Sequence, residues 1–136
     1  MPLRNNVSFD VLMPFDLKLH PIGEEIAAYL ANSIEQKTGM NSKTEIWRDS
    51  GYELDFLIGP KPFRFAFCYV GDQKYQFYGQ VASEIGWLRR LFGYRDQVEE
   101  EALIRAVHRT LTSDPTFTNV RWHEAWYDEK NMSKEP

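Results

Sequence analysis

Hydrophobic positions recur along the chain with two periods, and each period predicts one kind of element. Apolar and polar residues alternate over residues 7–13, which predicts a first strand. After Pro21, apolar residues recur every three or four positions as far as Gly39, which predicts a helix over residues 22–38. Pro21 suits the first turn of this helix, and Gly39 suits its end.

The middle of the chain predicts two hairpins, each built from two alternating segments around a short turn. Residues 43–49 and 52–58 flank a two-residue turn signal at residues 50–51. Residues 63–70 and 73–81 flank a second signal of the same kind. Together these segments predict a meander of four antiparallel strands.

The two-residue turn fixes a register for the first hairpin. It places Arg48 opposite Glu53, an opposite-charge pair, and Trp47 opposite Leu54. Trp47 then shares a face with the apolar residues of the second strand. Arg48 shares the other face with Glu53 and Asp55.

The same reasoning assigns the faces of the second hairpin. One face is expected to hold Phe77 with Cys68, and the other to hold Tyr78 with the aromatic residues of the first strand. The strand over residues 63–70 is apolar on both sides except at Arg64, which indicates a central strand covered on both faces.

Three elements are predicted after the hairpins: a short helix or ordered loop over residues 83–93, a helix over 97–112, and a strand over 117–126. The last strand would place Trp122 and Trp126 on one face.

This order of elements predicts an α+β fold. We expect an antiparallel sheet of four to six strands, a meander, with two main helices packed on it. If the first and last strands join the sheet, the result is an elaborated ferredoxin-like sandwich. The pattern does not show whether residues 7–13 join the sheet. Residues 1–136 are expected to form a single domain with loose ends at about 1–6 and 129–136.

The composition indicates a folded chain with one hydrophobic core. The chain has 136 residues, of which 43% are hydrophobic and 15% aromatic, so disorder is not expected for most of it. Cys68 is the single cysteine, and no signal peptide or membrane-length apolar stretch is visible. These features predict a cytoplasmic protein.

The net charge of -4 argues against nucleic-acid binding, but the charges are unevenly distributed. Residues 61–95 carry 6 basic and 2 acidic groups, net +4, between flanks that are each net -4. The aromatic residues between Phe63 and Tyr69 could stack on RNA bases, as in RNA-binding sheets. We expect them to be core residues instead, because the glycines of that motif are absent.

The sequence contains no motif that carries catalysis. The three histidines, His20, His108 and His123, lack the spacing of a metal site, and neither a nucleophile elbow nor a phosphate loop is present. We therefore expect no metal, no cofactor and no local catalytic residues. A site assembled from distant residues, with a histidine beside a carboxylate or an arginine, stays open.

One segment has the composition of a protein interface. Tryptophan, tyrosine and arginine are enriched at interface hot spots, and they gather after residue 86. The predicted partner-binding residues are Trp87, Arg89, Arg90, Phe92, Tyr94 and Arg95. The competing interpretation is a short amphipathic helix packed on the sheet with its arginines in water.

These observations favour a small protein-binding module. An inhibitor or an immunity or antitoxin-type protein, as bacteria use to block a toxin, would fit the size and the absence of catalytic motifs. The acidic flanks suit a basic partner, whereas the segment after residue 86 suits an acidic one. The alternatives are an enzyme with a site assembled from distant residues and a homodimeric adaptor or structural protein. We expect a monomer or homodimer that binds another protein, but neither nucleic acid nor a membrane.

Overall fold

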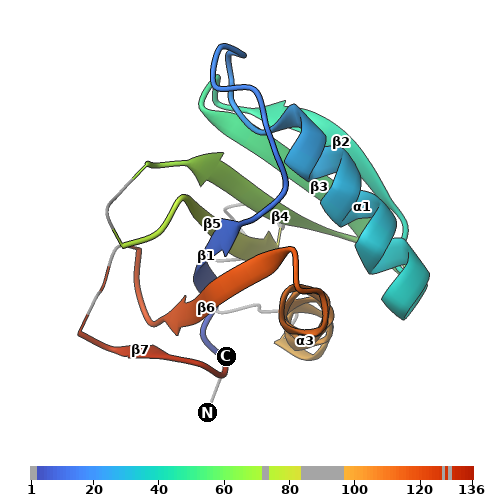
Figure 1. The fold of residues 1–136 in the computed structure, drawn as a ribbon. Helices are drawn as coiled ribbons and strands as arrows, with labels where there is room; N and C mark the ends of the chain where they lie inside the picture. The colour runs from blue at the N-terminus through green and yellow to red at the C-terminus, as the bar shows by residue number, and fades with distance from the viewer. Residues whose placement is uncertain (1–2, 72–73, 84–96, 127, 129) are drawn as a thin grey trace.

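A computed structural model describes residues 3–71, 74–83, 97–126, 128 and 130–136, and it has the α+β architecture expected from the sequence (Figure 1). The described elements, in chain order, are β1 (Asn6–Val11), α1 (Glu24–Thr38), β2 (Ser42–Trp47), β3 (Gly51–Ile58), β4 (Lys61–Tyr69), β5 (Phe77–Ser83), α3 (Gln97–Ser113), β6 (Phe117–His123) and β7 (Met132–Ser133). The strands form one antiparallel sheet in the order β2-β3-β4-β5-β1-β6-β7.

The described sheet has seven strands, more than the four to six expected. The additional strand is β7, which pairs with Trp122 and His123 at the end of β6. A strand of two residues is too short to produce an alternating pattern, so periodicity along the chain does not indicate it.

The first strand lies in the interior of the sheet. β1 pairs with β5 on one side and with β6 on the other. Val7 and Phe9 are fully buried, because they face the core between these neighbours. The sequence pattern did not show whether the first strand joins the sheet, and the structure shows that it does.

Both main helices lie close to their predicted positions. α1 begins at Glu24 rather than at residue 22, so Pro21 precedes the helix instead of lying in its first turn. Gly39 ends α1 as expected: its φ of 76° is left-handed, and its N–H donates to the Glu35 carbonyl oxygen at 2.8 Å.

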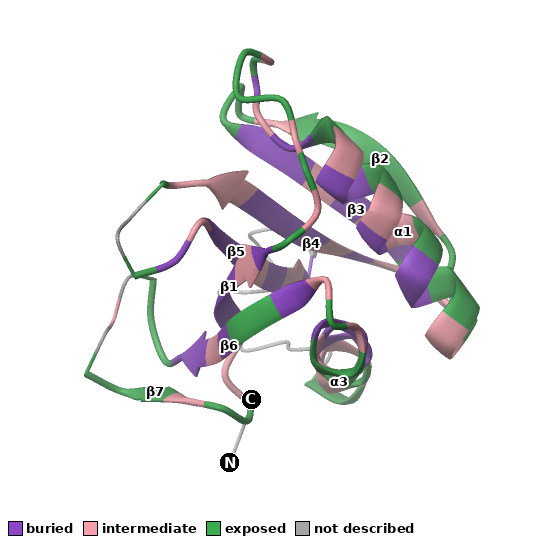
Figure 2. Ribbon diagram, viewed as in Figure 1, coloured by how far each residue is buried: buried purple, intermediate pink, exposed green. Residues whose placement is uncertain are grey.

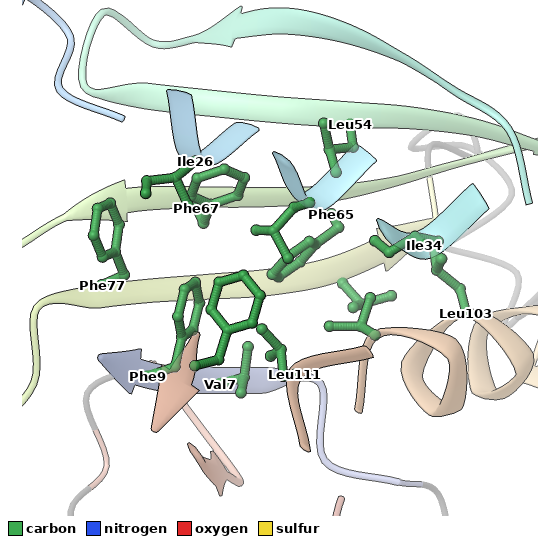
Figure 3. Close-up of a cluster of buried hydrophobic side chains, with 14 of the residues drawn as sticks. Val7, Phe9, Ile26, Ile34, Leu54, Phe65, Phe67, Phe77, Leu103 and Leu111 are labelled. Atoms are coloured by element: carbon green, nitrogen blue, oxygen red, sulfur yellow. The ribbon is translucent and has the colours of Figure 1, made fainter. Parts of the chain in front are cut away.

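The hydrophobic core lies between the two helices and one face of the sheet (Figure 3). Ile26 and Ile34 of α1 point towards the phenylalanine rings of the central strands, and Leu103 of α3 belongs to the same core (Figure 3). Phe65 and Phe67 are fully buried there. The aromatic run of β4 is therefore core, as expected from the sequence.

The register of the first hairpin differs from the predicted one. Trp47 pairs with Gly51, not with Leu54, and Arg48 and Asp49 form the turn with φ values of 51° and 57°. The pairing is displaced by three residues. Because side chains alternate between faces, an odd displacement moves Trp47 to the face opposite Leu54, while Arg48 leaves the strand.

The second hairpin has a longer loop than predicted. Tyr69 pairs with Phe77, so residues 70–76 form the connection. The Val70 and Gly71 N–H groups both donate to the Gln76 carbonyl oxygen, at 2.7 and 3.2 Å. Phe77 consequently lies on the face of Tyr69, with the core. The predicted placement of Phe77 on the face of Cys68 was wrong.

The last strand is shorter than predicted. β6 ends at His123, and Trp126 does not share the face of Trp122. The Trp126 ring instead contacts Tyr78, at a centroid distance of 4.4 Å. The predicted element over residues 83–93 lies outside the described residues, apart from Ser83. Within the described ranges, no helix combines the length and the apolar character needed to cross a bilayer.

Candidate functional site

The sheet has a second face, opposite α1 and α3, and this face gathers most of the polar chemistry of the strands. Residues directly opposite each other on neighbouring antiparallel strands share a face, so the register assigns the residues of the second face. They include Lys43, Glu45, Trp47, Glu53, Asp55, Arg64, Cys68, Tyr78, Ser8 and His123. β2 is largely exposed, whereas β4 has buried and half-buried residues and no exposed one (Figure 2).

Three carboxylates meet on β2 and β3, and we call Glu45, Glu53 and Asp55 the acidic cluster. Glu45 lies directly opposite Glu53, and Asp55 lies between Lys43 and Arg64. Lys43 Nζ contacts Glu45 Oε1 at 3.1 Å. The cluster therefore places like charges side by side on neighbouring strands.

The surroundings of Asp55 destabilise the charged form of its carboxyl. Burial raises its pKa to about 7, and a hydrogen bond to Glu53 and the charges of Glu53 and Glu45 add to the shift, while Arg64 opposes it. Asp55 Oδ1 is buried without a hydrogen-bond partner among the described residues. Near neutral pH the Asp55 carboxyl is therefore partly protonated, whereas an ordinary aspartate is fully charged there.

Three aromatic side chains lie beside the acidic cluster, and we call Trp47, Tyr78 and Trp126 the aromatic cluster. The Trp126 ring lies 6.1 Å from Trp47 and 4.4 Å from Tyr78, between centroids, with edge-on geometry at both contacts. Gly51 and Cys68 separate Trp47 from Tyr78 in their sheet row. Gly51 has no side chain and that of Cys68 is small, so there is room for the Trp126 ring.

Two further features of Trp47 bear on binding: a contact with Arg48 and an indole N–H without a described acceptor. The Arg48 guanidinium lies 5.6 Å from the centre of the Trp47 ring, within the range of a cation–π contact. Trp47 Nε1 is a buried donor without a hydrogen-bond partner in the described part of the chain. A buried N–H without a partner is costly, so an acceptor from a binding partner would be favoured there.

Hydrogen bonds from the sheet hold the C-terminal segment that carries Trp126. The Tyr78 hydroxyl donates to the Ala125 carbonyl oxygen at 3.1 Å. His123 Nδ1 lies 2.7 Å from the Asp128 carbonyl oxygen, which only accepts, so Nδ1 carries the hydrogen. His123 Nε2 then accepts from the Ser8 hydroxyl at 2.8 Å.

The chain from Ser8 through His123 to a carbonyl oxygen has the order of a hydroxyl nucleophile, a base and an orienting group. Ser8 and His123 are 1% and 0% exposed, however, and the His123 ring packs on Tyr78 at 5.2 Å between centroids. A substrate does not reach the Ser8 hydroxyl in this arrangement. These bonds therefore position the C-terminal segment rather than perform chemistry.

The bond between Ser8 and His123 was not found by reasoning from the sequence. The two residues lie near opposite ends of the chain and carry no shared motif. Only the pairing of β1 with β6 brings them together.

The other histidines lie elsewhere. His108 Nδ1 accepts from Trp122 Nε1 at 3.0 Å, and its Nε2 lies 3.1 Å from Glu135 Oε2. His20 is exposed and lies outside the sheet. Within the described ranges, no three histidine, cysteine or acidic side chains are arranged to hold a metal ion.

The predicted partner-binding residues Trp87, Arg89, Arg90, Phe92, Tyr94 and Arg95 all lie outside the described residues, so their surface stays a prediction. Cys68 is half-buried in β4, and burial raises the pKa of its thiol. A thiol with a raised pKa is a poor nucleophile.

Comparison with known proteins gives no assignment. No family model, no curated protein and no solved structure matches the chain. The chemistry of the second face is therefore what points to a function.

Proposed function

We propose that this chain is a protein-binding domain whose second sheet face binds a basic surface of another protein. The observation that carries the proposal is the position of the acidic cluster beside the aromatic cluster at the β2–β3 end of the sheet. Tryptophan and arginine are common anchors of interfaces, and a cluster of mutually repelling carboxylates supplies a charge that selects the partner.

The electrostatics of Asp55 support a basic partner rather than an acidic one. A lysine or arginine placed against Asp55 would favour its charged form and relieve the repulsion within the acidic cluster. An acidic partner would add to that repulsion. The raised pKa means that the charged form of Asp55 is destabilised, and a cationic side chain beside it would remove this destabilisation.

The finer proposal is an inhibitor or an immunity-type protein that covers the basic active site of its partner. The sheet order, with β1 between β5 and β6 and a four-strand meander beyond, suits an elaborated ferredoxin-like sandwich. That architecture hosts many unrelated functions, so the support comes from the second face and not from the fold.

The test is affinity capture from native lysate at low salt, followed by mass spectrometry. The wild type is compared with Glu45→Lys on the second face and with Glu35→Lys, the same charge change on the exposed face of α1. We expect one stoichiometric basic protein with the wild type and with Glu35→Lys, and its loss with Glu45→Lys.

Two outcomes would contradict the proposal. One is an empty capture with the wild type, and the other is a partner retained equally by all three chains. Binding to an identified partner should also weaken as pH falls below about 7, because protonated Asp55 no longer attracts a cation.

A further inference from the structure

β2 is an edge of the sheet with exposed residues along its length. Among the described strands the sheet order ends at β2, which pairs with β3 on its inner side. Its four residues from Lys43 to Ile46 are exposed, and the Ile46 side chain is 56% exposed although it is apolar. An edge strand offers unpaired N–H and C=O groups that another strand can bind.

We propose that β2 binds β2 of a second copy of this chain, antiparallel and centred on Thr44. The strand is self-complementary about that residue. Lys43 of each copy lies opposite Glu45 of the other, which forms two opposite-charge pairs, and Thr44 lies opposite Thr44. Opposite charges and threonine pairs are both favourable across antiparallel strands.

Charge selects this register over its nearest alternative. A pairing centred on Glu45 would place two carboxylates directly opposite each other, and such like-charge pairs are destabilising. A pairing displaced by a single residue would set the core face of one copy against the second face of the other. Centring on Thr44 keeps the faces aligned and also pairs the charges.

The existing contact between Lys43 and Glu45 does not prevent this exchange. Their side chains are 81% and 47% exposed, and an exposed ion pair of this kind is weak. Breaking this ion pair therefore costs little free energy, so each side chain can pair with the second copy instead. Because two short strand edges bury less area than a standard interface, we expect a weak dimer that forms at high concentration.

The dimer would place two second faces side by side in one continuous sheet, and so it would double the acidic cluster. This inference does not rest on the proposed function, because edge pairing uses the backbone of β2 and the pair formed by Lys43 and Glu45.

The test is sedimentation equilibrium of the full chain from about 1 µM to about 1 mM, the range expected for a small interface. Lys43→Glu should abolish the dimer, because a carboxylate at position 43 would then face Glu45, and Glu45→Lys should abolish it through two pairs of opposed ammonium groups. The double variant Lys43→Glu, Glu45→Lys should restore it. An equimolar mixture of the two single variants should form a heterodimer, since every opposed pair is then of opposite charge.

A wild type that stays monomeric at the highest concentration would overturn the proposal. So would a dimer that persists in both single variants, or single variants that do not associate when mixed. Circular dichroism of each variant confirms that it is folded. Lys43→Glu keeps all three carboxylates of the acidic cluster, so loss of the dimer with the basic partner still captured would show that the two proposals are independent.

Discussion

The carboxyl of Asp55 is held where burial and neighbouring acids oppose its charge. In the folded chain its pKa is about 7, whereas its ordinary value is 3.8. Between these values the folded chain binds a proton that the unfolded chain has released. The contribution of Asp55 to stability is therefore complete below its ordinary pKa and is lost as pH rises towards 7.

The free energy of unfolding should accordingly fall between about pH 4 and pH 7 and then level off. Asp55→Asn should remove this slope and raise stability at pH 8 by about 1 kcal/mol, because the amide carries no charge. Urea unfolding at pH 5 and pH 8 measures both effects. Glu35→Gln, on the exposed face of α1, is the control and should leave the slope unchanged. An unchanged slope in Asp55→Asn would contradict the assignment.

Replacement of Ser8 tests the hydrogen bonds that hold the C-terminal segment. Ser8→Ala removes the donor to His123 Nε2 in a fully buried place, so we expect a loss of about 1 kcal/mol in unfolding free energy. Thr112→Ala is the matched control. The Thr112 hydroxyl is exposed and donates to the His108 carbonyl oxygen, so its removal should leave the unfolding free energy nearly unchanged. Equal effects in thermal unfolding would argue against a special role for the Ser8 bond.

Two glycines are required for different reasons: Gly39 by the end of helix α1, and Gly51 by the close approach of strands β3 and β4. Gly39 ends α1 with a left-handed backbone, and the space that a Cβ would occupy there is open, so only its conformation requires glycine. Gly51 starts β3 beside β4, where an added Cβ would overlap the Phe67 carbonyl oxygen and lie 2.9 Å from Cys68 Cα. Backbone atoms of a central strand do not yield easily.

We therefore expect Gly51→Ala to destabilise the chain more than Gly39→Ala. The helix-end substitution should cost about 1 kcal/mol, from strain alone. The strand substitution should cost more than about 2 kcal/mol, because β3 must move away from β4 and with it the pairing of Trp47. Chemical denaturation of both variants gives the comparison. A smaller loss at Gly51 would show that the two strands separate easily.

The contact between Trp47 and Trp126 joins the two far ends of the sheet. One ring comes from the end of β2, and the other comes from the segment after β6. A double-mutant cycle with Trp47→Ala and Trp126→Ala should give a coupling of about 0.5–1.5 kcal/mol, as edge-on aromatic pairs do.

The control cycle combines Trp126→Ala with Leu57→Ala, whose exposed side chain lies at the other end of β3. These two substitutions should be additive. Additivity of the two tryptophan substitutions would instead mean that the C-terminal segment does not hold the second face together.

Much of the architecture follows from local periodicity. The alternation around Val7 and the helical spacing before Gly39 predicted β1 and α1 with small errors at their ends. The helix over residues 97–112 is also confirmed, since α3 spans Gln97–Ser113. The aromatic run of β4 was correctly assigned to the core. Each of these signals lies within one element, where spacing along the chain reports which side is buried.

The second face was not predictable in the same way. Turn length decides register, and a displacement of three residues moved Trp47 from the expected face of Leu54 to the face of Glu53. Trp126 was placed on a strand that in fact ends before it, and Ser8 met His123 only through the sheet.

The amino-acid sequence by itself determined the class of fold, the main elements and the core residues, because burial of apolar side chains has a period that is visible locally. The tertiary structure decided which polar and aromatic residues meet. Such meetings depend on pairings between distant strands, and an error of one residue in a turn reverses every face beyond it.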